Sequence, residues 1–166
     1  MTMEYEYKIK KTSICSEKEI LSFFELTKKA KQVNKIGLLD RIKKSEILGF
    51  SYHKGLLIGI SAIKIPSENY KNKIFNNAKI HKVGQDFKYE LGYSYTEEKY
   101  RGRQISYKLN LQLVSAMEEE NIYATTGNPG MKRILEKIGF LKIGKSYRGD
   151  YNEDIEILGL ERNKAF

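Results

Sequence analysis

The chain has 166 residues, of which 40% are hydrophobic, and its 30 lysine and arginine residues outnumber the 21 acidic residues to give a formal net charge of +9. This length and apolar content suit one globular domain, and we predict a single domain over residues 1–166. The longest uncharged apolar run, residues 55–63, is far shorter than the roughly 20 residues that cross a bilayer, which excludes a membrane span. We expect no membrane partner.

The ends of the chain, the cysteine content and the charge restrict the class of protein further. The first six residues lack the basic and apolar regions of an export signal, which favours a cytoplasmic protein. A single cysteine, Cys15, excludes an internal disulfide, and with two separated histidines, His53 and His81, we expect no metal site. The positive charge favours an anionic partner, such as a nucleic acid, a phosphorylated cofactor or an acidic protein surface. Because the lysines form short clusters, we favour a solvated lysine-rich surface over a dedicated nucleic-acid face.

The first part of the chain has regular polarity patterns. In chain order they predict a strand at residues 4–11, helices at residues 17–32 and 38–45, and a hairpin of strands at residues 47–52 and 56–65. Ser16 and Glu19 have the spacing of a capping box and mark the start of the first helix. A short Lys-Gly turn joins the two strands of the hairpin.

The second part begins with a polar stretch. Residues 67–85 are rich in asparagine and lysine and weakly patterned, which indicates an excursion on the surface. The patterns that follow predict strands at residues 87–96, 122–126, 140–145 and 155–160, and helices at residues 103–120 and between Asn128 and Gly139. In the strand at residues 87–96, alternate positions form one apolar face.

The turn that opens the predicted 103–120 helix carries groups suited to a phosphate. A helix N-terminus exposes unpaired backbone N–H groups and the positive end of the helix dipole. Gly102 lets a ligand approach the backbone closely, and Arg101 and Arg103 add positive charge at the same place. Many turns between a strand and a helix carry one glycine and an arginine for solubility or capping, so the turn alone is a weak signal.

Two blocks of sequence together resemble the GNAT superfamily of N-acetyltransferases. In the first, residues 99–104 (KYRGRQ) lead from a strand into a helix, as the family's pattern Gln/Arg-x-x-Gly-x-Gly/Ala does. In the second, residues 122–128 (IYATTGN) precede a helix that ends at Gly139 and Phe140. The resemblance covers residues 87–147. It implies an α/β, GNAT-like fold, in which a central, mostly antiparallel, splayed mixed sheet has helices on both faces.

The resemblance implies transfer of an acetyl group from acetyl-CoA to a primary amine by direct attack, without a metal. The pyrophosphate of acetyl-CoA is then expected at the N-terminus of the 103–120 helix and the thioester at the preceding strand. An asparagine that caps the next helix is expected to contact the pantetheine arm as well. The residues at these positions are Ser94, Tyr95, Thr96, Arg101, Gly102, Arg103, Gln104, Ile105, Ser106 and Asn128.

Glu90 is the candidate catalytic base, because the family often carries a glutamate or histidine on this part of the strand. The alternative is an exposed carboxylate at the end of a strand. Three positions depart from the family pattern. Lys99 stands in place of glutamine or arginine, Gln104 replaces a small residue, and Leu135 occupies the position of the tyrosine that protonates the leaving thiolate in many members. Catalysis through that tyrosine is therefore excluded.

The acceptor is expected to be a small-molecule or peptide amine, and the protein a monomer or homodimer. Residues 67–85 are interpreted either as a flap that selects the acceptor or as a surface loop without a role. As a flap, the stretch favours an acceptor with negative charge near the amine, through its basic residues Lys71, Lys73, Lys79, His81 and Lys82. One alternative function is modification of a nucleic acid by the same fold. Another, motivated by Leu135 and Gln104, is a catalytically silent module that binds coenzyme A.

Overall fold

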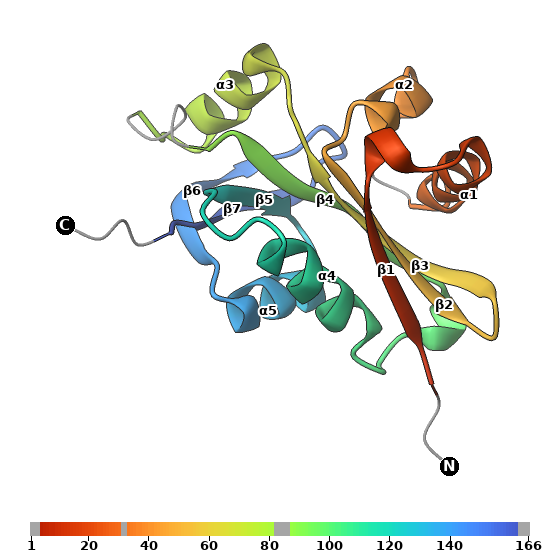
Figure 1. The fold of residues 1–166 in the computed structure, drawn as a ribbon. Coiled ribbons are helices and arrows are strands. Elements are labelled where there is room, and N and C mark those ends of the chain that lie inside the picture. Colours follow the sequence, from red (N-terminus) through yellow and green to blue (C-terminus); the bar gives the residue numbers. More distant parts are fainter. Residues whose placement is uncertain (1–3, 31–32, 82–86, 163–166) are drawn as a thin grey trace. The chain divides into compact units, whose positions relative to one another are not determined.

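Seven strands form a mixed sheet in the order β1-β2-β3-β4-β5-β7-β6 in this computed structural model (Figure 1). They are β1 (Glu6–Lys11), β2 (Ile47–His53), β3 (Leu56–Lys64), β4 (Tyr89–Thr96), β5 (Ile122–Thr126), β6 (Leu141–Arg148) and β7 (Asp154–Leu160). β4 pairs with β5 in parallel, whereas β1 with β2, β2 with β3, β5 with β7 and β6 with β7 are antiparallel. The structure describes residues 4–30, 33–81 and 87–162.

The helices are α1 (Glu17–Thr27), α2 (Leu38–Lys43), α3 (Glu68–Asn77), α4 (Ile105–Ser115) and α5 (Pro129–Ile138), with short 3-10 helices η1 (Thr12–Ile14) and η3 (Glu98–Tyr100). The chain divides into two compact units. The first unit comprises Met1–Lys64 and Leu91–Ala116, and the second comprises Ile65–Glu90 and Met117–Phe166, so the division falls within β4. Among the described residues, every helix is too short or too polar to cross a bilayer.

In the first unit, helices cover both faces of the strands (Figure 1). Side chains from β2 and β3 pack against α1 and α2 on one face, and this cluster includes Phe23, Leu26, Leu38, Ile42, Leu48, Phe50, Ile60 and Ala62. On the other face α4 lies so close to β2 that a Cβ atom at Gly49 would stand 3.0 Å from Cδ1 of Leu109. Glycine at this position therefore allows the close packing of helix on sheet.

Local signals in this unit are confirmed. Ser16 Oγ accepts a hydrogen bond from the N–H of Glu19 at 3.1 Å, and the Glu19 carboxylate accepts one from the N–H of Ser16 at 2.8 Å, which completes the capping box. Lys54 and Gly55, with φ of +50° and +78°, form the two-residue turn of the β2–β3 hairpin. The predicted 17–32 helix instead ends at Thr27, and residues 31–32 lie outside the described residues.

In the second unit, the interpretation of residues 67–85 as a weakly patterned excursion is wrong for the part that the structure describes. Ser67 caps α3 by accepting a hydrogen bond from the N–H of Tyr70, and α3 contributes to a buried core. That core consists of Ile74, Phe75, Ala78, Ile80, Phe87, Tyr123 and Ile157. Ile74 and Phe75 near the end of the helix, with Ala78 and Ile80 directly after it, anchor this segment although asparagine and lysine surround them. Residues 82–85 of the predicted excursion, Lys82 included, lie outside the described residues.

Lys71 also differs from the prediction of a basic flap. It is 3% exposed, and its ammonium group donates hydrogen bonds of 3.0 Å to the carbonyl oxygen of Phe87 and to Glu68. A lysine with these partners is a buried, paired part of its own unit rather than an exposed charge of a basic flap. Lys73 and Lys79 are exposed, as is His81.

Two further predictions, the strand at residues 87–96 and the helix at residues 103–120, differ from the structure in detail. The predicted alternation along residues 87–96 fails because Tyr89, Glu90 and Leu91 are all buried, and because Tyr93 adopts a left-handed conformation with φ of +56°. The helix predicted at residues 103–120 spans only Ile105–Ser115. The residue before it, Gln104, is left-handed with φ of +63°, which a continuing helix does not allow.

The last helix and the strands around it agree with the sequence patterns. Asn128 Oδ1 accepts hydrogen bonds from the N–H groups of Gly130 at 2.8 Å and Met131 at 3.3 Å, so Asn128 is the predicted helix cap. Pro129 occupies the first turn of α5, and Gly139, with φ of +124°, ends it. The predicted strands at 122–126, 140–145 and 155–160 correspond to β5, β6 and β7.

Candidate functional site

The turn between β4 and α4 leaves its backbone open to a ligand. Gly102 has φ of +78°, and a Cβ atom placed there would meet no other atom within 4 Å. Gln104, the residue whose bulk departs from the family pattern, is exposed in its left-handed conformation. The turn therefore combines two left-handed residues in three positions with open space beside the glycine, a conformation in which successive N–H groups form an anion-binding concavity.

The N-terminus of α4 completes this arrangement. The first turn of α4 contains no acidic residue, and the Gln104 side chain makes no capping hydrogen bond within the described part of the chain. By contrast, α1 carries a full capping box and two acidic residues in its first turn. The first N–H groups of α4 are thus left for water or a ligand at the positive end of the helix dipole.

Both predicted arginines lie at this turn and are held by neighbouring groups. Arg101 donates a hydrogen bond of 2.9 Å from Nε to the carbonyl oxygen of Thr96, and its guanidinium lies 5.4 Å from the ring centre of Tyr95. Arg103 donates one of 3.0 Å from Nη1 to the hydroxyl of Tyr5. These contacts fix two permanent positive charges beside the open backbone.

On β4, the strand before the turn, one residue has an unusual backbone conformation and the next has an engaged side chain. The left-handed Tyr93 is a strained position, of a kind that costs about 1–3 kcal/mol and concentrates at functional sites. Its ring lies 4.3 Å from the ammonium of Lys64 and contacts Phe23 edge-on, which holds the strain in place. The hydroxyl of Ser94 is bonded to the side chains of Ser61 and Asn110. The Ser94 side chain is therefore already engaged within the first unit.

Glu90, the predicted base, lies in the second unit and is 3% exposed. The alternative of an exposed strand-end carboxylate is therefore wrong. Glu90 pairs in the parallel ladder with Tyr123 of β5, so the two side chains stand on the same face of the sheet. The carboxylate is therefore held in the interior of the second unit.

Two tyrosines that the sequence analysis did not select lie near Glu90. Burial, and secondarily the charge of Glu90, raises the pKa of Tyr123 above its ordinary range; this side chain is 0% exposed, and its hydroxyl has no hydrogen-bond partner among the described residues. Burial followed by the charge of Glu90 raises the pKa of Tyr147, on β6, to about 12. The register of β5, β7 and β6 places Tyr147 on the same sheet face, a signal that no single strand pattern contains.

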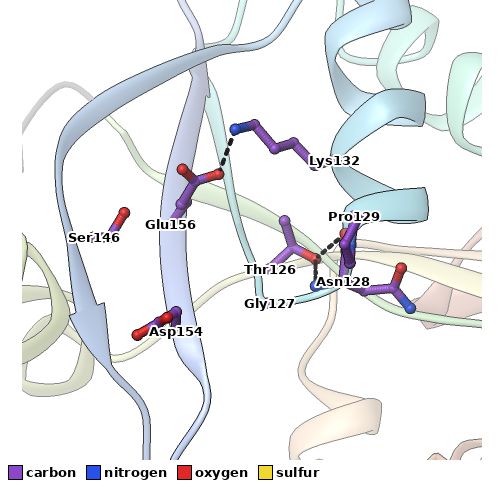
Figure 2. Close-up of a pocket in the computed structure, with 8 residues that line it drawn as sticks. All are labelled: Thr126, Gly127, Asn128, Pro129, Lys132, Ser146, Asp154 and Glu156. Atoms are coloured by element: carbon purple, nitrogen blue, oxygen red, sulfur yellow. Dashed lines mark hydrogen bonds and ion pairs between the residues drawn. The ribbon is translucent and has the colours of Figure 1, made fainter.

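Asn128 lines a pocket of about 480 Å³ in the second unit (Figure 2). Its lining residues are Thr126, Gly127, Asn128, Pro129, Lys132, Ser146, Asp154 and Glu156. Glu156 of β7 accepts ion-paired contacts from Lys132 at 2.8 Å and Lys142 at 3.1 Å, and the hydrogen bond from Lys132 is the main cause that lowers the pKa of this carboxyl. The pocket thus combines the N-terminus of α5 with an ion-paired carboxylate. Of its lining residues, only Asn128 is a predicted site residue.

The predicted site residues fall into two groups. Ser94, Tyr95, Thr96 and residues 101–106 belong to the first unit, where the strand end, the turn and the helix N-terminus follow one another. Glu90 and Asn128 belong to the second unit. No cluster of three or more histidine, cysteine or acidic side chains suited to a metal ion occurs in the described residues.

Similarity to known proteins is found in the fold and not in the sequence. No family model matches the chain, and no curated protein matches it. Solved structures match over nearly its full length. An acyl-CoA N-acyltransferase from Pseudomonas aeruginosa has a TM-score of 0.69 at 12% sequence identity, covering 96% of this chain and 100% of its own.

Two other structures give the same result. An acetyltransferase of the GNAT family from Streptococcus agalactiae has a TM-score of 0.66 at 16% identity, covering 98% of this chain and 100% of its own. A putative acetyltransferase from Salmonella typhimurium, solved with its cofactor acetyl-CoA, has a TM-score of 0.63 at 11% identity, covering 97% and 96%. With the strand order, the left-handed turn before α4 and the capped α5 all in place, the chain has the fold of the GNAT N-acetyltransferases.

Proposed function

We propose that the protein is an acetyl-CoA-dependent N-acetyltransferase that acetylates a primary amine of a small-molecule or peptide acceptor. The observation that supports this most is the turn before α4. Left-handed Gly102 and Gln104, an uncapped helix N-terminus and two fixed arginines together form a site for a pyrophosphate. The shared fold with acyl-CoA N-acyltransferases is consistent with that ligand.

Each part of the cofactor has a proposed partner. The N–H groups of residues 101–106 would hold the pyrophosphate, and the backbone of residues 94–96 would hold the thioester carbonyl and stabilise its developing negative charge. Asn128 uses Oδ1 to cap α5, so its exposed amide would offer the pantetheine arm only the nitrogen side of the group. Bound acetyl-CoA supplies an acetyl group activated as a thioester.

Proton removal is assigned to Glu90. As the amine nitrogen forms its bond to the acetyl carbon and the carbon–sulfur bond breaks, the amine must lose a proton and the departing thiolate must gain one. Glu90 accepts the amine proton directly or through one water. Glu90 is 3% exposed, so this proton acceptor is held at a fixed place inside the second unit.

The leaving thiolate needs a source of its proton other than the tyrosine that many GNAT enzymes use. Leu135 is 0% exposed, and it puts no acid at the position where those enzymes carry a tyrosine. A thiol has an ordinary pKa of about 8.5, so a released thiolate takes a proton from water readily at neutral pH. We propose that solvent, rather than a residue of α5, supplies this proton.

The cofactor part of the proposal is tested by calorimetry of acetyl-CoA binding. Gly102→Glu should abolish binding, because the side chain occupies the open space beside the backbone and its charge repels the pyrophosphate. Gly37→Glu is the matched control: Gly37 has φ of +67°, and a Cβ atom there also meets nothing within 4 Å, so strain and added charge are similar. If both variants bind acetyl-CoA as the parent does, the assigned site is wrong.

The catalytic part is tested with a panel of amines and peptides and detection of released thiol. With an acceptor in hand, Glu90→Gln should lower kcat/KM at least tenfold and remove the rise of kcat/KM with pH on the acidic limb, while acetyl-CoA affinity stays unchanged. An unaltered pH profile refutes the assignment of the base. Binding of acetyl-CoA without turnover on any acceptor identifies a silent binding module instead, and acceptor affinity that falls steeply with salt identifies a nucleic-acid substrate.

A further inference from the structure

A ring of hydrogen bonds lies inside the first unit, between β3, β4 and α4. Ser61 and Asn110 are both 0% exposed, and Ser94 is partly buried. The Ser61 Oγ atom lies 2.6 Å from Oδ1 of Asn110 and 2.7 Å from Oγ of Ser94, and Nδ2 of Asn110 lies 3.1 Å from that same Ser94 oxygen. Three side chains from three elements thus close a ring.

The direction of each bond follows from one backbone oxygen. Nδ2 of Asn110 also lies 2.8 Å from the carbonyl oxygen of Ser106, which can only accept a hydrogen bond. The amide nitrogen must therefore point to the Ser106 backbone, and the amide oxygen to Ser61. Asn110 then donates to Ser94, Ser94 donates to Ser61, and Ser61 donates to Asn110. Every hydroxyl hydrogen and both amide hydrogens are used, and bonds arranged head to tail strengthen one another.

This ring connects the two ends of the proposed cofactor site. Ser94 directly follows the left-handed Tyr93 on β4, at the strand proposed to hold the thioester. Ser106 stands in the first turn of α4, at the helix end proposed to hold the pyrophosphate, and its hydroxyl lies 3.1 Å from Nδ2 of Asn110. One asparagine therefore touches both segments, while the chain between them runs through eleven residues of strand end, 3-10 helix and turn.

We infer that Asn110 is a positioning residue, which sets the spacing between the thioester-binding strand and the pyrophosphate-binding turn so that one acetyl-CoA molecule engages both. This inference rests on the proposed function. The pantetheine arm has a fixed number of bonds, so a shift of β4 against α4 misplaces the thioester even when the pyrophosphate is well bound. Misplacement on the order of 1 Å is enough to cost as much as a hundredfold in rate.

A purely structural role for Asn110 makes a different prediction. Loss of buried hydrogen bonds lowers the fraction of folded protein, but it leaves the relative affinities of the folded protein for different ligands unchanged. A positioning role changes those relative affinities. Ligands that reach only the turn should be unaffected, whereas ligands that span the turn and β4 should bind more weakly.

The experiment compares acetyl-CoA with 3′-phospho-ADP, the nucleotide end of coenzyme A, by calorimetry on folded protein. In Asn110→Leu the Kd for acetyl-CoA should rise about tenfold while the Kd for 3′-phospho-ADP stays within about twofold of the parent value. Ser61→Ala opens the same ring with a smaller change and should shift the ratio in the same direction, so the test stands even if Asn110→Leu fails to fold.

Ser51→Ala is the matched control for Ser61→Ala. Ser51 is also a 0% exposed serine, on the neighbouring strand β2, but its hydroxyl has no hydrogen-bond partner among the described residues, so its removal costs no bond and should leave both affinities unchanged. A ratio that stays within twofold in Asn110→Leu and in Ser61→Ala overturns the inference. Failure of the parent protein to bind acetyl-CoA overturns the proposed function itself, and the two failures are thereby distinguished.

Discussion

Replacing Lys71 with methionine separates a structural lysine from a substrate-binding one. The Lys71 ammonium donates a 3.0 Å hydrogen bond to the buried carbonyl oxygen of Phe87, and its second partner, Glu68, is largely exposed. Methionine has nearly the same helix propensity and length, so the change removes the donor and the charge while α3 itself is not penalised. The variant leaves the Phe87 oxygen without its donor.

The expected loss of stability follows from these contacts. An unsatisfied buried carbonyl costs about 1–3 kcal/mol, and the exposed pair with Glu68 adds little. Burial of the methionine end regains part of this, so Lys71→Met should lower the free energy of unfolding by about 1–2 kcal/mol. For a chain of this length, each kcal/mol corresponds to a shift of the Tm by about 2–4 °C.

Urea and thermal unfolding of Lys71→Met measure this loss against Lys73→Met. Lys73 is on the same helix and exposed, so its replacement should change the free energy of unfolding by less than about 0.5 kcal/mol. In acceptor assays Lys71→Met should leave the KM for the acceptor unchanged. Equal stability of the two variants, or a raised acceptor KM in folded Lys71→Met alone, contradicts a structural role for Lys71. Either result supports the hypothesis of a basic flap that binds the acceptor.

Two further predictions concern titrating groups. The backbone N–H of Ser16, and then Lys10, hold the pKa of Glu19 below its ordinary value. The ionised carboxylate therefore stabilises the fold at pH values above the ordinary glutamate pKa, and this contribution is lost as the pH falls through the lowered pKa. In urea titrations, the difference in free energy of unfolding between the parent and Glu19→Gln should be about 0.5–1 kcal/mol at neutral pH and vanish at acidic pH. Absorbance titration should find one phenol of pKa about 12 that disappears in Tyr147→Phe and moves downward in Glu90→Gln, since the Glu90 charge is one of its causes; an unmoved pKa in Glu90→Gln contradicts the proximity of the two groups.

Features that depend on a few consecutive residues were predictable from the sequence. The capping box at Ser16, the hairpin turn at Lys54 and the cap at Asn128 each arise from hydrogen bonds or dihedral angles within about four positions, and all are present. The order of elements and the basic glycine turn at Gly102 follow from the same kind of local signal. This is why the fold class was accessible from the chain alone.

Features that depend on distant residues were not predictable. The burial of Glu90 is set by the neighbouring strand and by the cluster around α3, which no pattern within β4 contains. The ring at Asn110 joins residues separated by 16 and 49 positions. The helix α3 was missed because its polar residues outnumber the few apolar ones that anchor it, so the packing partner decides its structure rather than its own periodicity.

The division of the chain within β4 has a consequence for folding during synthesis. Neither unit is continuous in sequence. The first unit is complete only after Leu91–Ala116 has been synthesised, and residues 65–90 find the rest of their unit only when the C-terminal strands have been made. At roughly 5–20 residues per second, the apolar side chains of α3 remain without their partners on β7 for several seconds after they leave the ribosome. Nascent chains arrested before β7 should therefore expose Phe75 and Ile74, bind chaperones, and be cut by proteases in this segment before the rest of the protein.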